Sequence, residues 1–472
     1  MSEPPPIHLF NSRTRRKERF VPRDAARVSV YWCGPTVYGP AHIGNARPAV
    51  VFDVLVRLLR AFYARVEHMS NITDIDDKLI AASAASGDPV EVLARRYEAQ
   101  YFEDMAGLGC ARPDFVPRAS AHVADMIALI EALLARKSAY EAEGHVLFAS
   151  AAWPSYGALS QRSAAARRAG ARIEVAPYKK SAEDFVLWKP SPPDQPGWES
   201  PWGRGRPGWH TECVAMIESR FGGGVDIHGG GADLLFPHHE NEAAQFGARH
   251  DDAALARVWM HNAMLVQRGE KMSKSAGAIR SVREFLAAHG GDVLRLLLLQ
   301  THYRHPLELS DDAVRQAETS LMRLYQGLRL TQEAETKDEA APAPDEVRAW
   351  AASEPLRPVV AALCDDLNLP LALTHMFAAM RAADRLDAKD KAAGKAQRGA
   401  LRRLMRFLGF GLVLPPHLAE IEALLRERDR ARAKKDFARA DKLRDKLAEL
   451  GAAVEDRPGE PSLWHMQRTR KP

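Results

Sequence analysis

Hydrophobic positions along the first two thirds of the chain predict strands and helices in alternation. An alternating apolar run from Val28 to Cys33 ends at Gly34-Pro35, which predicts a strand that leads into a loop. Apolar residues between Ala49 and Leu59 recur at helical spacing, so the helix should begin near His42. A strand, a glycine-containing turn and a helix in this order are typical of the opening of a nucleotide-binding α/β unit.

The middle of the chain predicts an insertion into this α/β unit. Residues 119–136 have the apolar spacing of another amphipathic helix. Residues 138–208 combine short mixed strands with a segment rich in Pro, Gly and Trp, and the chain should return to the core at Trp209. A second α/β half then extends to about residue 300.

The last third predicts helices almost throughout. Residues 331–345 are rich in Glu, Ala, Pro and Lys without apolar periodicity, which predicts a linker. The stretch 426–450 predicts one basic helix whose buried side comes from Leu425, Phe437, Leu443 and Leu447. The remaining residues, 451–472, should be a basic loop with one tryptophan, Trp464.

Composition restricts the class of protein without deciding its function. The 472 residues are 46% hydrophobic and 27% charged, which indicates a globular protein of several domains. No apolar run reaches the roughly 18 to 20 residues of a membrane span, and the N-terminus does not resemble a secretory signal, so we expect a cytoplasmic protein without membrane contact. The four cysteines should be free thiols or metal ligands. The net charge of +5 suits a partner that is a polyanion, but many other enzymes have such a charge.

The segment Pro40-Ala41-His42-Ile43-Gly44-Asn45 is a candidate phosphate site. Unpaired N–H groups at a helix N-terminus favour phosphate, and His42 and Asn45 lie one helical turn apart. Gly44 leaves room for a ligand to approach the backbone. Taken alone, such residues more often cap a helix.

Two lysines, Lys271 and Lys274, lie in the segment Lys-Met-Ser-Lys-Ser, close to glycine and other small residues. They could neutralise a phosphate chain as the α-phosphate is attacked, although exposed lysine pairs are commonly only solvated. The chain has no GxxxxGK[ST] phosphate loop, so ATP would be held by this segment and the previous one.

Four residues form a possible zinc shell: Cys33, Cys213, His238 and Glu242. His238 and Glu242 are four residues apart, so we expect them on one face of a helix. The cysteines have no CxxC spacing, and the i,i+4 pair is the only local support. For Cys110 and Cys364 the better interpretation is that of small buried hydrophobic residues.

A triple glycine follows the short apolar strand at 226–228 and precedes Asp233. The glycines would let the backbone pass close to a ligand, and Asp233 could accept hydrogen bonds from ribose or adenine. Without context, a triple glycine indicates only a tight turn.

Together and in this order, these segments resemble the cysteinyl-tRNA synthetases. The resemblance extends from about residue 8 to Trp464 and includes CGPTVYGPAHIGNARP, NITDIDDK, VAPYKKSAEDFVLWKP, GWHTECVAM, DIHGGGADLLFPHHENE, WMHN and KMSKS. It implies an α/β fold: a Rossmann-type class I catalytic domain with an insertion, followed by all-α stem-contact and anticodon-binding regions. The implied ranges are 1–120 and 205–310 for the split catalytic domain, 121–204 for the insertion, 311–335 for the stem-contact region and linker, 345–420 for a helical bundle and 421–472 for the anticodon-binding end.

The resemblance also assigns roles to residues of this chain. It implies catalysis by His42, Asn45, Lys271 and Lys274, ATP binding by His42, Gly44, Asn45, Asp233 and Lys274, contact between Trp209 and substrate, and one Zn²⁺ held by Cys33, Cys213, His238 and Glu242. Asn45 replaces the second histidine of the family's HIGH signature and still donates a neutral hydrogen bond. The implied partners are ATP with Mg²⁺, L-cysteine and tRNA(Cys), and we expect a monomer.

Zinc in this family would be a device for selecting cysteine. Packing alone distinguishes near-isosteres such as cysteine and serine by only about 1–3 kcal/mol, whereas a thiolate is a much better zinc ligand than a hydroxyl. The basic helix from Arg426 to Lys446 should contact the anticodon region, with Trp464 stacked on a base. On charge alone, a solvated helix face is an equal alternative.

Two other functions remain open from the sequence. A paralogous ligase that joins cysteine to an amino-sugar would use the same adenylation, but such ligases lack the anticodon-binding end that residues 420–464 resemble. A non-catalytic RNA-binding protein on a dead synthetase scaffold would not need the lysines and the metal ligands.

Overall fold

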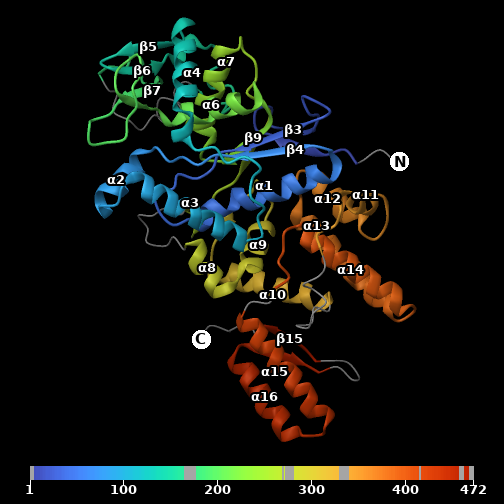
Figure 1. Ribbon diagram of the computed structural model, residues 1–472. Helices are drawn as coiled ribbons and strands as arrows, with labels where there is room; N and C mark the ends of the chain where they lie inside the picture. The colour runs from blue at the N-terminus through green and yellow to red at the C-terminus, as the bar shows by residue number, and fades with distance from the viewer. Residues whose placement is uncertain are drawn as a thin grey trace.

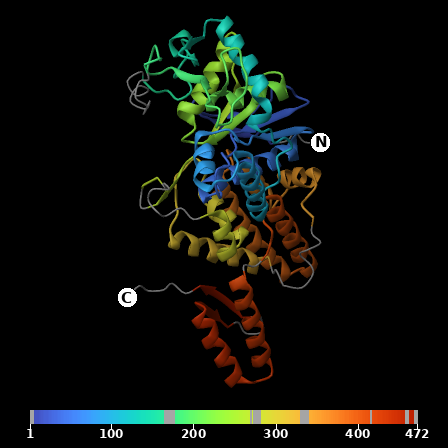
Figure 2. The same ribbon diagram turned by 60° about the vertical axis from the view of Figure 1, so that its left-hand side comes forward.

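The computed structural model describes residues 5–163, 177–267, 270–271, 281–328, 340–413, 416–456 and 462–466. At 267, 270–271, 416–419, 463 and 465–466 only the backbone is described. The molecule is elongated: a small antiparallel sheet and its helices lie at one end, a parallel sheet lies next to them, and a helical hairpin forms the opposite end (Figures 1 and 2). In the described part of the chain, no helix has both the length and the apolarity that crossing a membrane would need.

A four-stranded parallel sheet forms the centre, in the order β10-β9-β3-β4. Its strands are β3 (Val28–Trp32), β4 (Val66–Ser70), β9 (Val225–Gly231) and β10 (Ala256–Asn262). Every residue of β3 and β4 is buried, as expected for strands of a parallel sheet that is covered on both faces. The predicted first strand is therefore confirmed, and the triple glycine lies in strand β9 and its end rather than in a separate turn.

Helix α1 (Ile43–Phe62) begins directly after the loop that follows β3. Fourteen of its 20 residues are buried, because it packs between the sheet and helices of the second half of the chain. The predicted start near His42 is confirmed, since His42 is the N-cap with extended backbone. The N-terminus of α1 thus opens at the carboxyl edge of the parallel strands, where ligands bind in open α/β sheets.

The chain between β4 and β9 contains a second, antiparallel sheet in the order β5-β6-β7-β8. Helix α4 (Val123–Ala135) confirms the predicted amphipathic helix, with a 3₁₀ turn at Ala119–His122 before it. The other elements are α2 (Asp77–Ser86), α3 (Val90–Gly107), β5 (Ala139–Ala142), β6 (His145–Phe148), a 3₁₀ turn (Ser150–Ala152), β7 (Phe185–Pro190), β8 (Gly205–Pro207) and α6 (Trp209–Phe221).

The chain after β9 is mostly helical. After a π turn (Leu235–His239) come α7 (Glu240–Arg249), β11 (Leu265–Gln267), β12 (Glu270–Lys271), α8 (Val282–His289), α9 (Gly291–Leu299), β13 (Leu307–Glu308) and α10 (Asp311–Gly327). A bundle then follows, formed by α11 (Pro344–Ala352), α12 (Arg357–Cys364), α13 (Leu369–Asp387) and α14 (Lys391–Phe407). At the other end of the chain, an N-terminal hairpin consists of β1 (His8–Asn11) and β2 (Arg16–Arg19). Most of the predicted linker lies outside the described residues.

The C-terminal unit differs from the single helix and loop predicted for it. Two antiparallel helices, α15 (Pro416–Ala433) and α16 (Phe437–Glu449), are followed by a hairpin of β14 (Ala452–Glu455) and β15 (Leu463–Met466). Lys435 has a positive φ of 60°, and Asp436 caps α16 through the Arg439 N–H, so the basic stretch is broken at these residues.

Two aromatic residues in this unit have environments opposite to those predicted. Phe437 is 62% exposed instead of buried, because the break places it in the first turn of α16. Trp464 is 2% exposed, and its indole N–H donates to Glu422 at 2.7 Å, so it cannot stack on a base as predicted.

Candidate active site and metal centre

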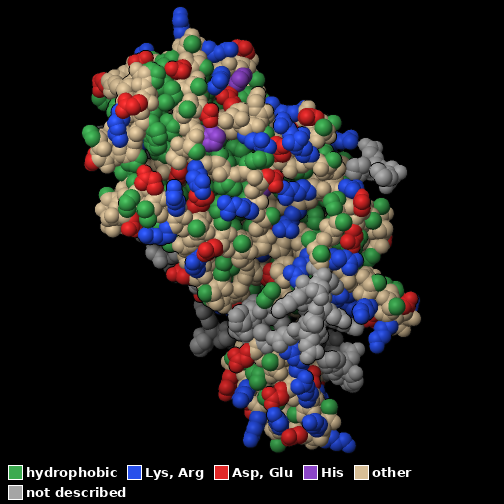
Figure 3. Space-filling model, in the orientation of Figure 1, with side chains coloured by type: hydrophobic (Ala, Val, Ile, Leu, Met, Phe, Trp, Pro, Cys, Tyr) green, Lys and Arg blue, Asp and Glu red, His purple; other side chains and the backbone are tan. Residues whose placement is uncertain are grey.

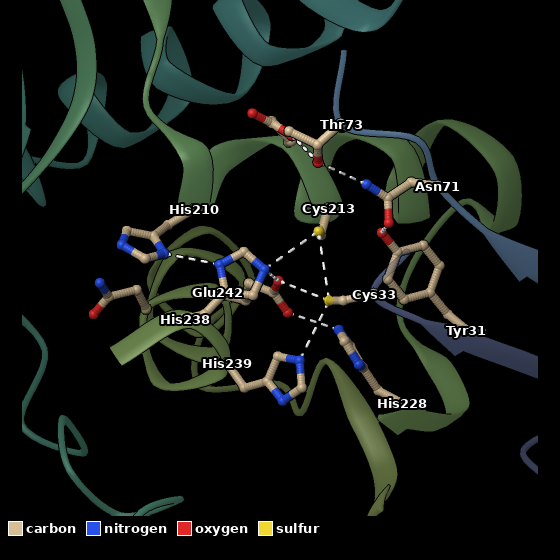
Figure 4. Close-up of polar contacts among 12 residues, drawn as sticks. Tyr31, Cys33, Asn71, Thr73, His210, Cys213, His228, His238, His239 and Glu242 are labelled. Atoms are coloured by element: carbon tan, nitrogen blue, oxygen red, sulfur yellow. Dashed lines mark hydrogen bonds and ion pairs between the residues drawn. The ribbon is translucent and has the colours of Figure 1, made fainter. Parts of the chain in front are cut away.

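Four side chains from separate elements converge behind the carboxyl edge of the parallel sheet (Figure 4). Cys33 directly follows β3, Cys213 lies on α6, His238 in the π turn and Glu242 on α7. All four are buried, and one potential ligand atom from each lies within 4.8 Å of the others. The prediction that His238 and Glu242 lie on one regular helix is wrong, because His238 lies in the π turn before α7. Their i,i+4 spacing still brings His238 Nε2 within 2.8 Å of Glu242 Oε1.

The distances in this cluster fit a tetrahedral zinc shell. Ordinary zinc bond lengths place two sulfur ligands about 3.8 Å apart, and a sulfur about 3.6 Å from a nitrogen or oxygen ligand. The two Sγ atoms are 3.7 Å apart, Cys213 Sγ lies 3.6 Å from His238 Nε2, and Cys33 Sγ lies 3.6 Å from Glu242 Oε1. The shorter His238–Glu242 contact is a hydrogen bond that would lengthen by about half an ångström around a metal.

A second set of possible ligands shares Cys33 and Glu242 with the first. It adds His239, whose Nε2 lies 3.3 Å from Cys33 Sγ, and His228, whose Nε2 lies 2.6 Å from Glu242 Oε2. This set contains one thiol where the first contains two, and soft thiolates favour zinc over harder cations. The first set therefore fits zinc better, with His228 in close polar contact with the carboxylate ligand.

Interactions within the cluster stabilise the charged forms of the buried side chains His238 and Glu242. Burial favours the neutral imidazole, but the Glu242 carboxylate and the Cys213 sulfur outweigh it and raise the pKa of His238 to about 10. Burial would raise the pKa of Glu242, yet the neighbouring His238 and His228 lower it well below its usual value. Burial also raises the pKa of Cys33, followed by its hydrogen bond with Cys213. A cation in place of the His238 proton would compensate the carboxylate and the thiolates directly.

Neighbouring polar groups fix the orientation of the ligands. His238 Nδ1 lies 2.9 Å from His210 Nδ1, so its other nitrogen is directed at Cys213 and Glu242. The Glu240 carboxylate, fully buried, accepts hydrogen bonds from the backbone N–H groups of Gly157 at 2.8 Å and Ser160 at 2.7 Å. These bonds tie a loop of the inserted segment to the start of the helix that carries Glu242.

A cleft opens in front of this cluster and has a volume of about 310 Å³. Six of the residues selected from the sequence line it together: Cys33, His42, Gly44, Asn45, Trp209 and Asp233. Trp209 is 40% exposed at the start of α6, and its ring stacks on His238 with centroids 4.2 Å apart. One wall of the cleft therefore leads directly to the candidate metal ligands.

The N-terminus of α1 also lines this cleft. Asn45 Oδ1 accepts from the backbone N–H of His42 at 3.1 Å, so this asparagine helps to cap the helix. A Cβ atom at Gly44 would lie only 2.8 Å from His42 Nδ1, which explains the glycine between the two side chains.

The two predicted lysines are only partly placed. Lys271 pairs with Val266 in the small sheet of β11 and β12, but its side chain is not among those described. Lys274 lies outside the described residues.

Sequence reasoning missed the histidines that surround the candidate metal centre. His228, His239 and His261 are buried, and His239 Nδ1 lies 2.7 Å from His261 Nε2. A usable signal was that each of these histidines falls in a segment already selected: His228 in β9, His239 in the π turn that follows it and His261 near the end of β10. No spacing rule connects them, because they meet only through the sheet register.

Three family profiles match successive parts of the chain. Residues 19–319 match "tRNA synthetases class I (C) catalytic domain", residues 358–413 match "DALR domain", and residues 415–461 match "Cysteinyl-tRNA ligase anticodon binding domain". The profiles therefore cover most of the chain, including the C-terminal unit.

Curated proteins named cysteine–tRNA ligase are similar to this chain over nearly its whole length. A cysteine–tRNA ligase of Parvibaculum lavamentivorans is 48% identical over 96% of both chains, and one of Acidiphilium cryptum is 50% identical over 96% of this chain and 98% of its own. Among solved structures, the Mycobacterium tuberculosis methionyl-tRNA synthetase in complex with methionyl-adenylate has a TM-score of 0.56 at 18% identity, covering 84% of this chain and 94% of its own. That structure is similar in fold.

Proposed function

Since the chain belongs to the cysteinyl-tRNA synthetases of class I, we propose that the cleft between α1 and the four-residue cluster is where it activates cysteine. The protein is a cysteine–tRNA ligase: it forms cysteinyl-adenylate from L-cysteine and ATP and transfers the cysteine to tRNA. The observation that carries the proposal for the site is that Cys33 belongs both to the candidate metal cluster and to the lining of this cleft.

We propose that Cys33, Cys213, His238 and Glu242 hold one zinc ion. When bound, zinc would supply a soft Lewis acid that accepts the substrate's thiolate and discriminates against the hydroxyl of serine. Two buried thiols, an imidazole and a carboxylate at tetrahedral distances support this identity of the metal. Trp209, which stacks on His238 and is partly exposed in the cleft, would pack against the bound amino acid.

ATP would lie along the N-terminus of α1. His42 and Asn45 line the cleft there, and the positive end of the helix dipole favours the anionic triphosphate, which would carry Mg²⁺. Asp233, on the other side of the same cleft, would accept hydrogen bonds from the nucleoside. Lys271 and Lys274 would neutralise the phosphates as the cysteine carboxylate attacks the α-phosphate and pyrophosphate leaves.

The C-terminal unit has a surface suited to a nucleic acid. Between α15 and α16 lies a groove lined by four basic side chains: Arg426, Arg430, Lys434 and Arg439. Lys and Arg side chains project from this unit with Asp and Glu between them (Figure 3). The exposed ring of Phe437 begins α16 next to Asp436, which lines the groove. We propose that the cations meet anticodon-loop phosphates while Phe437, instead of Trp464, stacks on a base.

We further propose a monomer that works in the cytoplasm. All residues assigned to the cleft and cluster come from one chain, so activity needs no second copy. All four cysteines are free, and a reducing compartment would keep the Cys33 and Cys213 thiols available for a metal.

Aminoacylation of a tRNA pool, with each amino acid offered separately and the metal content of the same sample measured, tests this function. We expect transfer of cysteine alone and about one zinc per chain. Cysteine-dependent ATP–pyrophosphate exchange without transfer to tRNA would instead indicate a ligase for another acceptor, and the absence of both activities would contradict the proposal.

A further inference from the structure

Arg47 is a buried cation at the back of the proposed nucleotide cleft. It lies on α1 about one turn after Gly44, its side chain is fully buried, and it contributes to the lining of the same cleft. Arginine is rarely buried completely unless it is paired with an acidic group. In the part of the chain whose side chains are described, Arg47 forms no ion pair, so its burial requires another explanation.

Backbone carbonyls replace the missing carboxylate. Nη1 donates to the carbonyl oxygens of Ala263 at 2.6 Å and Met264 at 3.3 Å. Nη2 donates to those of His305 at 2.7 Å and His302 at 3.3 Å. The planar guanidinium therefore joins α1 to two other segments of backbone, and it does so in a geometry that its fixed fork of donors permits.

One of the two segments that Arg47 holds lines the same cleft as the start of α1. Ala263 and Met264 line the cleft and lead into β11. The loop at 302–305 supports them, because the Ala263 N–H donates to the Tyr303 carbonyl at 2.8 Å. Strand β11 in turn pairs with β12, which ends at Lys271. Arg47 therefore connects α1 directly to another segment of the cleft lining.

We propose that Arg47 is a positioning residue for ATP: it fixes the wall at 263–265 relative to the N-terminus of α1 and so sets the width of the nucleotide cleft. This inference rests on the proposed function, which places ATP in that cleft. The buried charge is consistent with it. Burial lowers the pKa of Arg47 to about 10, and no acidic neighbour opposes the shift, so the positive charge remains available to an anionic ligand.

Three substitutions separate geometry from charge. Arg47→Lys keeps the charge but offers one nitrogen where the guanidinium spreads its donors over four carbonyls. Arg47→Gln keeps two N–H donors but removes the positive charge, and Arg47→Met removes the donors as well as the charge. Arg398→Lys is the matched control, because Arg398 is also buried, at 4% exposed, but binds Asp384 and Asp387 in the helical bundle, away from the cleft.

Cysteine-dependent ATP–pyrophosphate exchange by the full-length zinc-loaded enzyme gives the readout. We expect KM for ATP to rise about 10- to 100-fold in Arg47→Gln and Arg47→Met and less in Arg47→Lys, with KM for cysteine and zinc content unchanged. If Arg47 were needed only for folding, its substitution would reduce the fraction of active enzyme and so lower the apparent kcat. The KM values for ATP and cysteine would then remain as in the control.

An unchanged KM for ATP in Arg47→Lys and Arg47→Gln would overturn the inference. These two variants decide the matter even if Arg47→Met does not fold. The same assay on the wild type and on His42→Ala keeps the two proposals apart. If the wild type shows no exchange, the proposed function fails. If it is active, His42→Ala is impaired and the Arg47 variants keep their KM for ATP, only the role of Arg47 fails.

Discussion

Single atoms decide the chemistry of the candidate metal centre. Cys213→Ser replaces one sulfur by oxygen in a side chain that is 1% exposed and lies 3.7 Å from Cys33 Sγ. Loss of a partner that only orients a ligand costs about 10- to 100-fold in metal affinity, so loss of a ligand should cost more. We predict that Cys213→Ser loses zinc, measured by elemental analysis, and discriminates less between cysteine and serine in pyrophosphate exchange.

Cys364→Ser provides the control for this change. Cys364 is 3% exposed in the helical bundle, and burial alone raises the pKa of its thiol to about 12. This variant should keep its zinc and its preference for cysteine. Equal zinc content in the two variants would refute the ligand assignment.

His68 should make stability depend on pH. It is buried on β4, and its Nε2 accepts from the Trp32 indole at 2.9 Å; burial, followed by the nearby Arg60, lowers its pKa to about 4 despite Asp114 and Asp53. With a usual value of about 6.5, the unfolded chain binds this proton more readily, so stability falls as pH drops from 6.5 toward 4. The contribution between pH 7 and pH 5 is about 2 kcal/mol.

Urea unfolding of the wild type and of His68→Gln at both pH values measures this contribution. Gln keeps an acceptor for the indole but does not titrate, whereas all other groups titrate in both proteins. We expect the wild type to lose about 2 kcal/mol more than the variant between pH 7 and pH 5. The prediction is wrong if both proteins lose the same amount.

At the scale of elements, two arginines connect α1 to the end of α14. Arg295 is fully buried, pairs with Asp53 of α1 and donates to the carbonyl of Leu408 at 2.6 Å. Arg57, itself on α1, binds Asp53 at 2.9 Å and donates to the carbonyls of Arg406 and Phe407 at 3.5 Å each. The negative end of a helix favours such cations, so this joint stabilises the contact between α1 and the bundle.

Asp53→Asn should therefore be costly. It removes a carboxylate that pairs with the buried Arg295, and breaking a buried ion pair costs about 3–5 kcal/mol. The exposed pair of Glu354 and Arg357, each 60% exposed, is the comparison: Glu354→Gln should cost less than about 1 kcal/mol. Chemical denaturation measures both, and similar small losses would show that the joint contributes little.

Elements were predictable from the sequence where burial imposes a period. The strand at 28–32 and the helix from 43 follow apolar patterns, because one is buried on both faces and the other lies between layers. The break between α15 and α16 was not predictable from that pattern, because it depends on a positive φ at Lys435 and a cap at Asp436 in a uniformly basic stretch. That break also accounts for the wrong burial of Phe437.

At the scale of the molecule, the parallel sheet, whose carboxyl edge carries the cleft, lies far from helices α15 and α16 of the C-terminal unit along an elongated body (Figure 1). Recognition of the anticodon and activation of cysteine should therefore be separable. Phe437→Ala removes a ring that is 62% exposed, and loss of one stacked base costs about 1–3 kcal/mol. We expect KM for tRNA to rise about 5- to 150-fold in aminoacylation while tRNA-independent pyrophosphate exchange is unchanged.

Phe437→Trp is the matched variant, since it keeps an aromatic face and should keep KM for tRNA near the wild-type value. If Phe437→Ala leaves KM for tRNA unchanged, the anticodon region does not stack on this residue. Equal effects of both variants would indicate a local structural role instead.

The meeting of the metal ligands could not be derived from spacing. Cys33 and Glu242 are separated by two strands of the sheet and the whole inserted segment, and only the resemblance to a family connected them before the fold was known. The positions of the surrounding histidines could not be predicted from the sequence either. His228 faces Glu242 because β9 pairs in register with β3, and a single sequence does not reveal that register.

X-ray absorption at the zinc edge, with and without cysteine, tests the central claim that this cluster selects the substrate by its sulfur. The purified enzyme should show zinc with two sulfur ligands, from Cys33 and Cys213, and addition of L-cysteine, but not of L-serine, should raise the number to three. A protein that binds no zinc, or a sulfur count that cysteine leaves unchanged, would contradict it.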